Sequence, residues 1–289
     1  MDCVPICFVE ETILLLDCCT FVKPYEPLQQ LTSGWGEIAN RELDVINSHG
    51  GLVLYLRNNE ESTQFAFGCD GEEVSWSEVY SSRTAVTRIR MIMFGYDKPF
   101  SEWGELDDEN LRRLRALLAT NSLSPGLKIV SRIKFNQDLV QKVLLFTSRI
   151  SHLVFDHGSM QFITAILKHA VRRGAVAHVQ IRAPLCISQE TVEFVCELAS
   201  AKQFEYLHMY VSAMSHVNAS RCMKKIMDCV EISGLTKTFY FFGQLNCGAA
   251  ARFKLRAEEM RCAFEHTAAT DQRDRSVTLT VIRLPPVAA

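Results

Sequence analysis

Apolar residues recur along the chain in the signature apolar-x-x-apolar-x-apolar, which ends in the alternation of apolar and polar positions typical of a β-strand. Clear copies lie at Val130/Ile133/Phe135, Ile150/Leu153/Phe155, Val176/Val179/Ile181 and Phe204/Leu207/Met209. Weaker copies lie at Val86/Ile89/Met91, around Phe239 and Phe241, and at Val277/Leu279/Val281. Because the copies are unevenly spaced, they indicate a degenerate repeat of strands.

The segments between these strands have the periodicity of amphipathic helices, and their ends can be recognised. Ser159 is expected to cap a helix that stops at Gly174, and Ser188 is expected to open another. An earlier helix is expected to begin near Asp107, because acidic residues there suit the positive end of the helix dipole. Alternating strands and helices favour parallel pairing through right-handed crossovers, so an α/β fold is predicted.

Two architectures share this alternation of elements: a doubly wound sheet covered on both faces, and an open arc of leucine-rich-repeat type. Strands of a doubly wound sheet are continuously apolar, whereas these strands alternate apolar and polar residues. The prediction is therefore a degenerate, leucine-rich-repeat-like arc of parallel strands.

The polar positions of these strands would face outward on a common surface of the arc. Many of them carry aromatic, histidine or arginine side chains, and aromatic residues and arginine are enriched where proteins bind proteins. The candidate binding residues are Arg132, His152, His178, Arg182, Tyr206, His208, Tyr210 and Tyr240. The alternative is an ordinary solvated face of a sheet.

A β-hairpin is predicted between residues 50 and 71. Alternating leucines from Leu52 to Leu56 precede a polar stretch, and two phenylalanines in alternation follow it. In a short helix after the hairpin, Trp76 and Tyr80 stand one turn apart and are expected to anchor the core.

The clearest breaker cluster in the chain, at residues 122–126, marks a soft domain boundary. We therefore expect three regions. They are a helical module at residues 1–48, a connecting α/β region with the hairpin at residues 49–125, and a strand-helix repeat region at residues 126–289.

The helical module has a pattern of its own. Pro5 follows Val4 at the expected start of a helix, and an apolar run from Ile13 to Leu16 comes next. A second apolar set closes on Leu31, Trp35, Ile38 and Ala39. In this order the module resembles an F-box. It is most similar to the F-box-like openings of a large set of nematode proteins that begin Met-Asp-x-Val-Pro and continue into a repeat-like α/β region.

The resemblance implies a non-enzymatic substrate receptor of a cullin-RING ubiquitin ligase. The opening of the module is where the family docks on a Skp-type adaptor protein, so the candidate adaptor contacts are Val4, Pro5, Phe8 and Leu14. The repeat region would bind the protein substrate, whose identity the sequence does not give. Two alternatives stay open: a general protein-interaction scaffold, in which the apolar residues of the module pack on the rest of the protein, and an α/β enzyme without a familiar motif.

Charge is distributed unevenly although the net charge is only −2. Residues 1–110 contain 20 acidic and 7 basic side chains, whereas residues 111–289 contain 13 acidic and 24 basic ones. The basic residues are scattered over predicted helices rather than gathered in a patch. The uneven charge is therefore better explained by two regions with different surface chemistry than by the binding of an acidic partner. Nucleic acid is not an expected partner.

No catalytic, cofactor or metal site is expected. The 11 cysteines are odd in number and contain no Cys-x-x-Cys pair, which argues against a zinc site and a disulfide framework. The common nucleophile, zinc-hydrolase, phosphate-loop and dinucleotide motifs are missing. No apolar run approaches the roughly 20 residues that span a bilayer, and no secretory signal is recognised. A cytoplasmic or nuclear protein without membrane contact is therefore expected.

Overall fold

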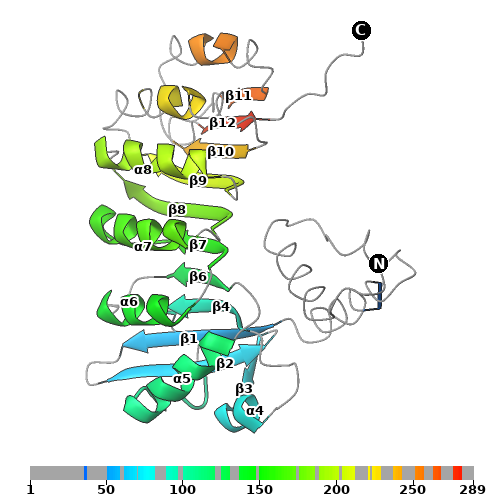
Figure 1. Cartoon of the computed structure of the whole chain (residues 1–289), viewed down its shortest axis with the longest axis vertical. Helices are drawn as coiled ribbons and strands as arrows, with labels where there is room; N and C mark the ends of the chain where they lie inside the picture. Colours follow the sequence, from blue (N-terminus) through cyan, green and yellow to red (C-terminus); the bar gives the residue numbers. More distant parts are fainter. Residues whose placement is uncertain are drawn as a thin grey trace, which may run out of the picture. The chain divides into compact units, whose positions relative to one another are not determined.

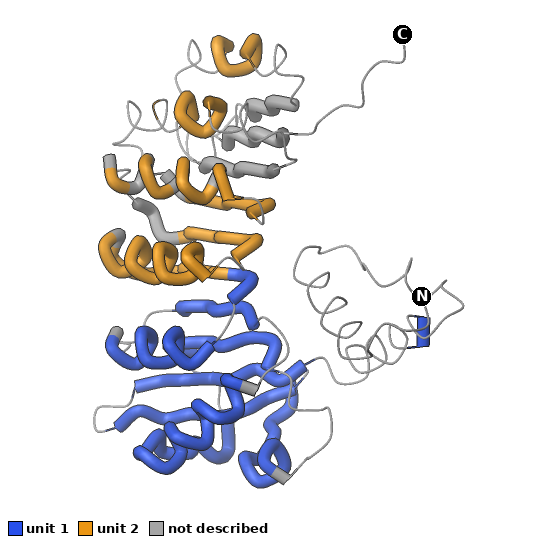
Figure 2. The backbone as a smooth tube through the Cα atoms, in the orientation of Figure 1, with its two compact units in different colours: residues 1–152 blue, residues 153–289 orange. Residues whose placement is uncertain are grey.

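The computed structural model describes much of the chain between residues 51 and 211 and shorter stretches on either side. The described residues are 36–37, 51–58, 62–69, 71–81, 89–96, 100–120, 125–130, 137–147, 150–173, 176–185, 189–201, 204–211, 221, 223–228, 237–242, 251–256, 263–267 and 276–281. They fall into two compact units, residues 1–152 and residues 153–289 (Figure 2). Both units combine helices with β-strands, which confirms the predicted α/β class.

The first unit has a mixed sheet (Figure 1). Its strands are β1 (Leu52–Asn58), β2 (Thr63–Cys69), β3 (Glu72–Val74), β4 (Ile89–Phe94), β5 (Gly104–Glu105) and β6 (Gly126–Ile129). They lie in the order β6-β4-β1-β2-β3, and β5 pairs with β2. Strands β1 and β2 pair antiparallel, which confirms the predicted hairpin, whereas β4 is parallel to both β1 and β6.

Both faces of β1 are buried. On one face, Leu54 and Leu56 are 0% and 1% exposed. On the other face, Tyr55 forms a small cluster with Ala66 and Phe100. Because a strand that is covered on both faces has no solvated side, β1 is a nearly continuous apolar run.

The helices of the first unit are α4 (Trp76–Ser81), α5 (Asp108–Thr120) and α6 (Gln137–Phe146). Helix α5 begins where the acidic cluster predicted it, and the backbone N–H of Asn110 donates to Asp107 Oδ1 at 2.7 Å. Leu114 and Leu118 on α5 are at most 1% exposed, and α5 contacts α6.

Only one of the two aromatic residues on α4 anchors the core. The Trp76 ring stacks on the Phe67 ring, with centroids 5.3 Å apart and an interplanar angle of 11°. Tyr80 is 55% exposed, so the expectation that it anchors the core is wrong. The Tyr80 ring lies next to the Trp76 ring, with centroids 5.6 Å apart, and the guanidinium of Arg113 lies 5.4 Å from the Tyr80 centroid.

The second unit has strands β7 (His152–Phe155, with His152 still counted in the first unit), β8 (His178–Leu185), β9 (Tyr206–Val211), β10 (Lys237–Phe242), β11 (Ala263–Thr267) and β12 (Ser276–Val281). They lie in the order β11-β12-β10-β9-β8-β7. Strand β9 is parallel to β8 and to β10. Helix α7 (Met160–Arg172) connects β7 to β8, and helix α8 (Gln189–Ser200) connects β8 to β9.

Three clear copies of the strand signature coincide with β7, β8 and β9. Their apolar positions are at most 4% exposed; these are Ile150, Leu153, Phe155, Val176, Val179, Ile181, Phe204, Leu207 and Met209. The predicted cap of α7 is also confirmed, because Ser159 Oγ accepts a hydrogen bond from the Phe162 backbone N–H at 3.3 Å.

The strand expected over Val130 to Phe135 is placed differently. Strand β6 ends at Ile129, and residues 131–136 lie outside the described part of the chain. Gly126, assigned to the breaker cluster from the sequence, is the first residue of this strand and is buried. A Cβ at this position would lie 2.8 Å from Met91 Cε, so the flexible end of the Met91 side chain would have to shift.

The prediction of an all-parallel repeat is wrong at the C-terminal end. Strand β12 pairs antiparallel with both β10 and β11, and the signature did not identify β11. A parallel pair needs a crossover of a dozen or more residues, whereas only residues 268–275 separate β11 from β12. This short connection permits an antiparallel pair.

Within the helical module predicted at residues 1–48, the structure describes only Gly36 and Glu37, which are helical. The F-box-like module therefore lies almost entirely outside the described residues, and the regions expected at 1–48, 49–125 and 126–289 stay predictions. Among the helices that are described, none combines the length and the apolar character needed to cross a membrane.

Candidate functional site

Strands β8, β9 and β10 bring the predicted binding positions together in rows. His178 pairs with Tyr206, which pairs with Thr238 on the next strand. One step along, Gln180 pairs with His208, which pairs with Tyr240. We call this side of the three strands, with His178, Gln180, Arg182, Tyr206, His208 and Tyr240, the strand face.

The strand face lies opposite the buried apolar side of β8 and β9. Val179 and Leu207, which alternate with its residues, are both 0% exposed. Gln180, Tyr206 and His208 are instead partly exposed, as expected from the period-two alternation of a strand. The side chains of Tyr210 and Tyr240 lie outside the described part, although the backbone places Tyr210 opposite Phe242 in the same ladder.

His178 is less accessible than an outward position should be, because only 7% of it is exposed. Its ring centroid lies 5.7 Å from that of Tyr206, and its Nε2 lies 3.5 Å from Glu205 Oε2. Burial raises the pKa of Glu205 above its ordinary value. His178 is therefore mostly covered by its neighbours on the strand face and leaves little of its own side chain for contact with a partner.

Arg182 is exposed and is held by two neighbours. One guanidinium nitrogen donates to Gln180 Oε1 at 2.9 Å, and the other lies 3.4 Å from Asp156 Oδ1. Burial, together with the charge of Arg182, lowers the pKa of His208. His208 is therefore neutral at pH 7, and a neutral imidazole has one hydrogen-bond donor and one acceptor.

Two of the predicted binding residues are not part of this group. His152 belongs to the first unit, where Ser151 Oγ lies 2.7 Å from its Nδ1, and burial with the nearby charge of Arg90 lowers its pKa to about 4. Arg132 lies outside the described residues, as do all four candidate adaptor contacts, Val4, Pro5, Phe8 and Leu14.

The chemistry of the strand face suits recognition of another molecule. It combines a guanidinium, an amide, a neutral imidazole and a tyrosine, which together donate and accept hydrogen bonds and supply aromatic area. Within the described ranges, no group of three or more His, Cys, Asp or Glu side chains is arranged to hold a metal ion.

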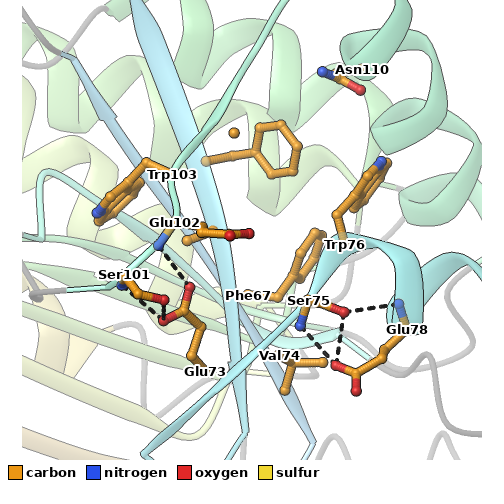
Figure 3. Close-up of a pocket in the computed structure, with 13 residues that line it drawn as sticks. Phe67, Glu73, Val74, Ser75, Trp76, Glu78, Ser101, Glu102, Trp103 and Asn110 are labelled. Carbon is orange, nitrogen blue, oxygen red and sulfur yellow. Dashed lines mark hydrogen bonds between the residues drawn. The ribbon is translucent and has the colours of Figure 1, made fainter.

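A second candidate site, in the first unit, was missed from the sequence (Figure 3). A pocket of about 620 Å³ lies between β2, β3, α4 and the segment before β5, and we call it the aromatic-acidic pocket after its residues Phe67, Glu73, Trp76, Glu78, Glu102 and Trp103. The one indication of this pocket in the sequence is that residues 1–110 are rich in acidic side chains and contain both of these tryptophans.

Comparison with known proteins adds no relative to this picture. No family model matches the chain, and neither the curated proteins nor the solved structures contain a significant match to it. The two candidate sites are therefore judged on their own geometry.

Proposed function

We propose that the chain is a non-enzymatic substrate receptor of a cullin-RING ubiquitin ligase, which binds its protein substrate through the strand face. The observation that carries this proposal is the alignment of Gln180, His208 and Tyr240 in one row, beside the row of His178 and Tyr206. Aromatic and guanidinium groups of this kind supply most of the binding energy at protein interfaces.

We propose a leucine-rich-repeat-like arc as the architecture behind this face. Strands β7, β8, β9 and β10 follow one another in the sheet in chain order, and α7 contacts α8. Crossovers of a single hand between strands in this order would place both helices on one side of the sheet. The opposite side, which carries the strand face, would then be open to a partner.

The adaptor half of the proposal is supported by the F-box-like order of apolar residues in the first forty-odd positions. Val4, Pro5, Phe8 and Leu14 are the proposed contacts with a Skp-type adaptor. A receptor of this class would act in the cytosol or nucleus and would need no cofactor, because the ligase supplies the chemistry.

The direct test is copurification of the full chain with a coexpressed Skp-type adaptor. We expect the wild-type chain to copurify in a stoichiometric complex and the Leu14→Glu variant to lose it, because the substitution places an unpaired charge in a desolvated interface. Pro5→Ala should weaken the complex. Circular dichroism must show that each variant is folded.

Leu145→Glu is the matched control. Leu145 on α6 is 60% exposed, so the same change of leucine to glutamate should leave both the fold and the adaptor complex intact. If the wild-type chain does not bind the adaptor, or if a folded Leu14→Glu variant binds it fully, the receptor role is wrong.

A general protein-interaction scaffold is the second candidate, and the strand face favours it equally because that face needs no adaptor. Adaptor binding separates the two functions. A chain that captures partners through Tyr206 and His208 but does not bind the adaptor would be a scaffold.

A further inference from the structure

The aromatic-acidic pocket has an apolar floor and wall. Phe65 and Phe67 on β2 are 3% and 1% exposed, and Trp76 packs against both rings, with centroid distances of 5.1 Å and 5.3 Å. Trp103 lines the opposite side (Figure 3). Because the phenylalanines are fixed in the core, the position of the Trp76 indole is also fixed.

Two carboxylates of the pocket have structural hydrogen bonds. Glu73 accepts from the Ser101 backbone N–H at 2.9 Å, from the Ser101 hydroxyl at 2.7 Å and from the Glu102 backbone N–H at 3.0 Å, so it ties the segment before β5 to β3. Glu78 accepts from the Ser75 backbone N–H and hydroxyl, both at 2.9 Å. The hydrogen bonds from Ser75 lower the pKa of Glu78.

The third carboxylate, that of Glu102, has no such role. Its side chain has no hydrogen-bond or ion-pair partner among the residues that the structure describes. In Figure 3 it points inward, between Trp103 and Phe67, because Glu73 holds its backbone. Three negative groups thus border one aromatic hollow, and none of the described residues that line it is Lys, Arg or His.

Two described arginines lie against aromatic rings of this region, and each also has a polar partner. Arg57 Nε donates to Gln64 Oε1 at 2.9 Å, and its guanidinium lies 3.8 Å from the centroid of the Trp103 ring. Arg113 forms an ion pair with Glu109 at 2.8 Å. The Arg57 contact shows that this aromatic cluster accepts a stacked guanidinium, while Glu102 is left without one.

We propose that the aromatic-acidic pocket binds the side chain of an arginine on a partner peptide. The planar guanidinium stacks on an indole ring, its forked N–H groups donate to the carboxylate of Glu102, and the apolar stem lies against the phenylalanines. Asn110, which lines the pocket and donates through Nδ2 to the Glu105 carbonyl, presents its Oδ1 as a further acceptor. This site is independent of the strand face and of the receptor role.

The test is a titration of the full-length ¹⁵N-labelled chain with the peptide Gly-Ser-Gly-Arg-Gly-Ser-Gly, followed by the indole N–H signals of Trp76 and Trp103, which Trp→Phe variants assign. We expect a saturable shift of both signals with a Kd on the order of 1 mM or tighter. The same peptide with citrulline, a neutral isostere of arginine, should bind at least about tenfold more weakly. The lysine peptide should also bind more weakly than the arginine peptide.

The matched variants are Glu102→Gln, which removes the free carboxylate, and Glu72→Gln, which removes an exposed carboxylate from β3 that does not line the pocket. Glu102→Gln should weaken binding roughly three- to fivefold, whereas Glu72→Gln should leave it unchanged. Both positions are exposed, so both variants should fold.

Several results would overturn the proposal. One is the absence of a saturable shift at about 10 mM arginine peptide, well above the expected Kd. Another is equal binding of the citrulline or lysine peptide, which would remove the case for a charged, planar group. Equal weakening by Glu102→Gln and Glu72→Gln would show a diffuse charge effect rather than binding at this pocket.

Discussion

The orientation of β9 can be tested by replacing two consecutive residues with alanine. Leu207 is 0% exposed and pairs with Val179 on β8 and Phe239 on β10, whereas His208 next to it lies on the strand face and is partly exposed. In a fully buried site, Leu→Ala removes three carbons and leaves a cavity, which costs about 3–4 kcal/mol. His208→Ala removes a partly solvated side chain and should cost about 1 kcal/mol or less.

Urea unfolding followed by circular dichroism measures both values. With a slope of about 2 kcal/mol per molar urea, Leu207→Ala should lower the transition midpoint by about 1.5–2 M, and His208→Ala by about 0.5 M or less. A shift of the strand by one residue would exchange the two faces and therefore the two results. If His208→Ala were the more destabilising substitution, both the register of β9 and the strand face would be wrong.

Two further predictions concern local structure in each unit. In the second unit, Ser159→Ala removes the N-cap of α7 and should lower the free energy of unfolding in urea by about 1 kcal/mol. The control is Ser200→Ala: the Ser200 hydroxyl donates to the Cys196 carbonyl at the end of α8, and its loss should cost about 0.5 kcal/mol or less. Equal losses for the two variants would contradict the capping role of Ser159. In the first unit, the pKa of His152 is lowered from 6.5 to about 4, so between these values the unfolded chain binds a proton that the folded chain does not. The contribution of His152 to the free energy of unfolding should therefore be fully present above pH 6.5, and it should fall by up to about 3 kcal/mol towards pH 4. Thermal melts at several pH values should show a flatter pH dependence for His152→Gln than for the wild type. An equally steep profile would show that His152 is not the cause of the pH dependence.

Much of the fold could be predicted because apolar periodicity directly determines which residues are buried. The alternation at Val179 and Ile181 located β8 and its buried side, and Ser159 located the start of α7. Strand direction was harder to predict, since periodicity is the same for parallel and antiparallel strands. Strand β11 contains Phe264 between Ala263 and Glu265, which gives no apolar alternation to recognise, and so it was missed.

The two candidate sites also differ in how far the sequence could predict them. The strand face followed from alternation along single strands, and pairing across three strands then aligned its residues. The aromatic-acidic pocket brings together Phe67, Trp76 and Glu102, which lie on β2, on α4 and before β5. No period in the sequence relates these positions. They meet because β5 pairs with β2 and because Glu73 holds the segment before β5.

The electrostatics of the two sites imply different kinds of partner. On the strand face, His208 is neutral at pH 7 and the charge of Arg182 lies beside that of Asp156, so recognition there depends on hydrogen bonds and aromatic area. In the aromatic-acidic pocket, the carboxylates of Glu73, Glu78 and Glu102 line the same hollow as Trp76 and Trp103, and none of the described lining residues is basic. Added salt screens charges that are exposed to solvent, so it should weaken a ligand of the pocket far more than a ligand of the strand face. One partner that needed both sites would have to join an arginine-containing segment to a neutral, hydrogen-bonding one.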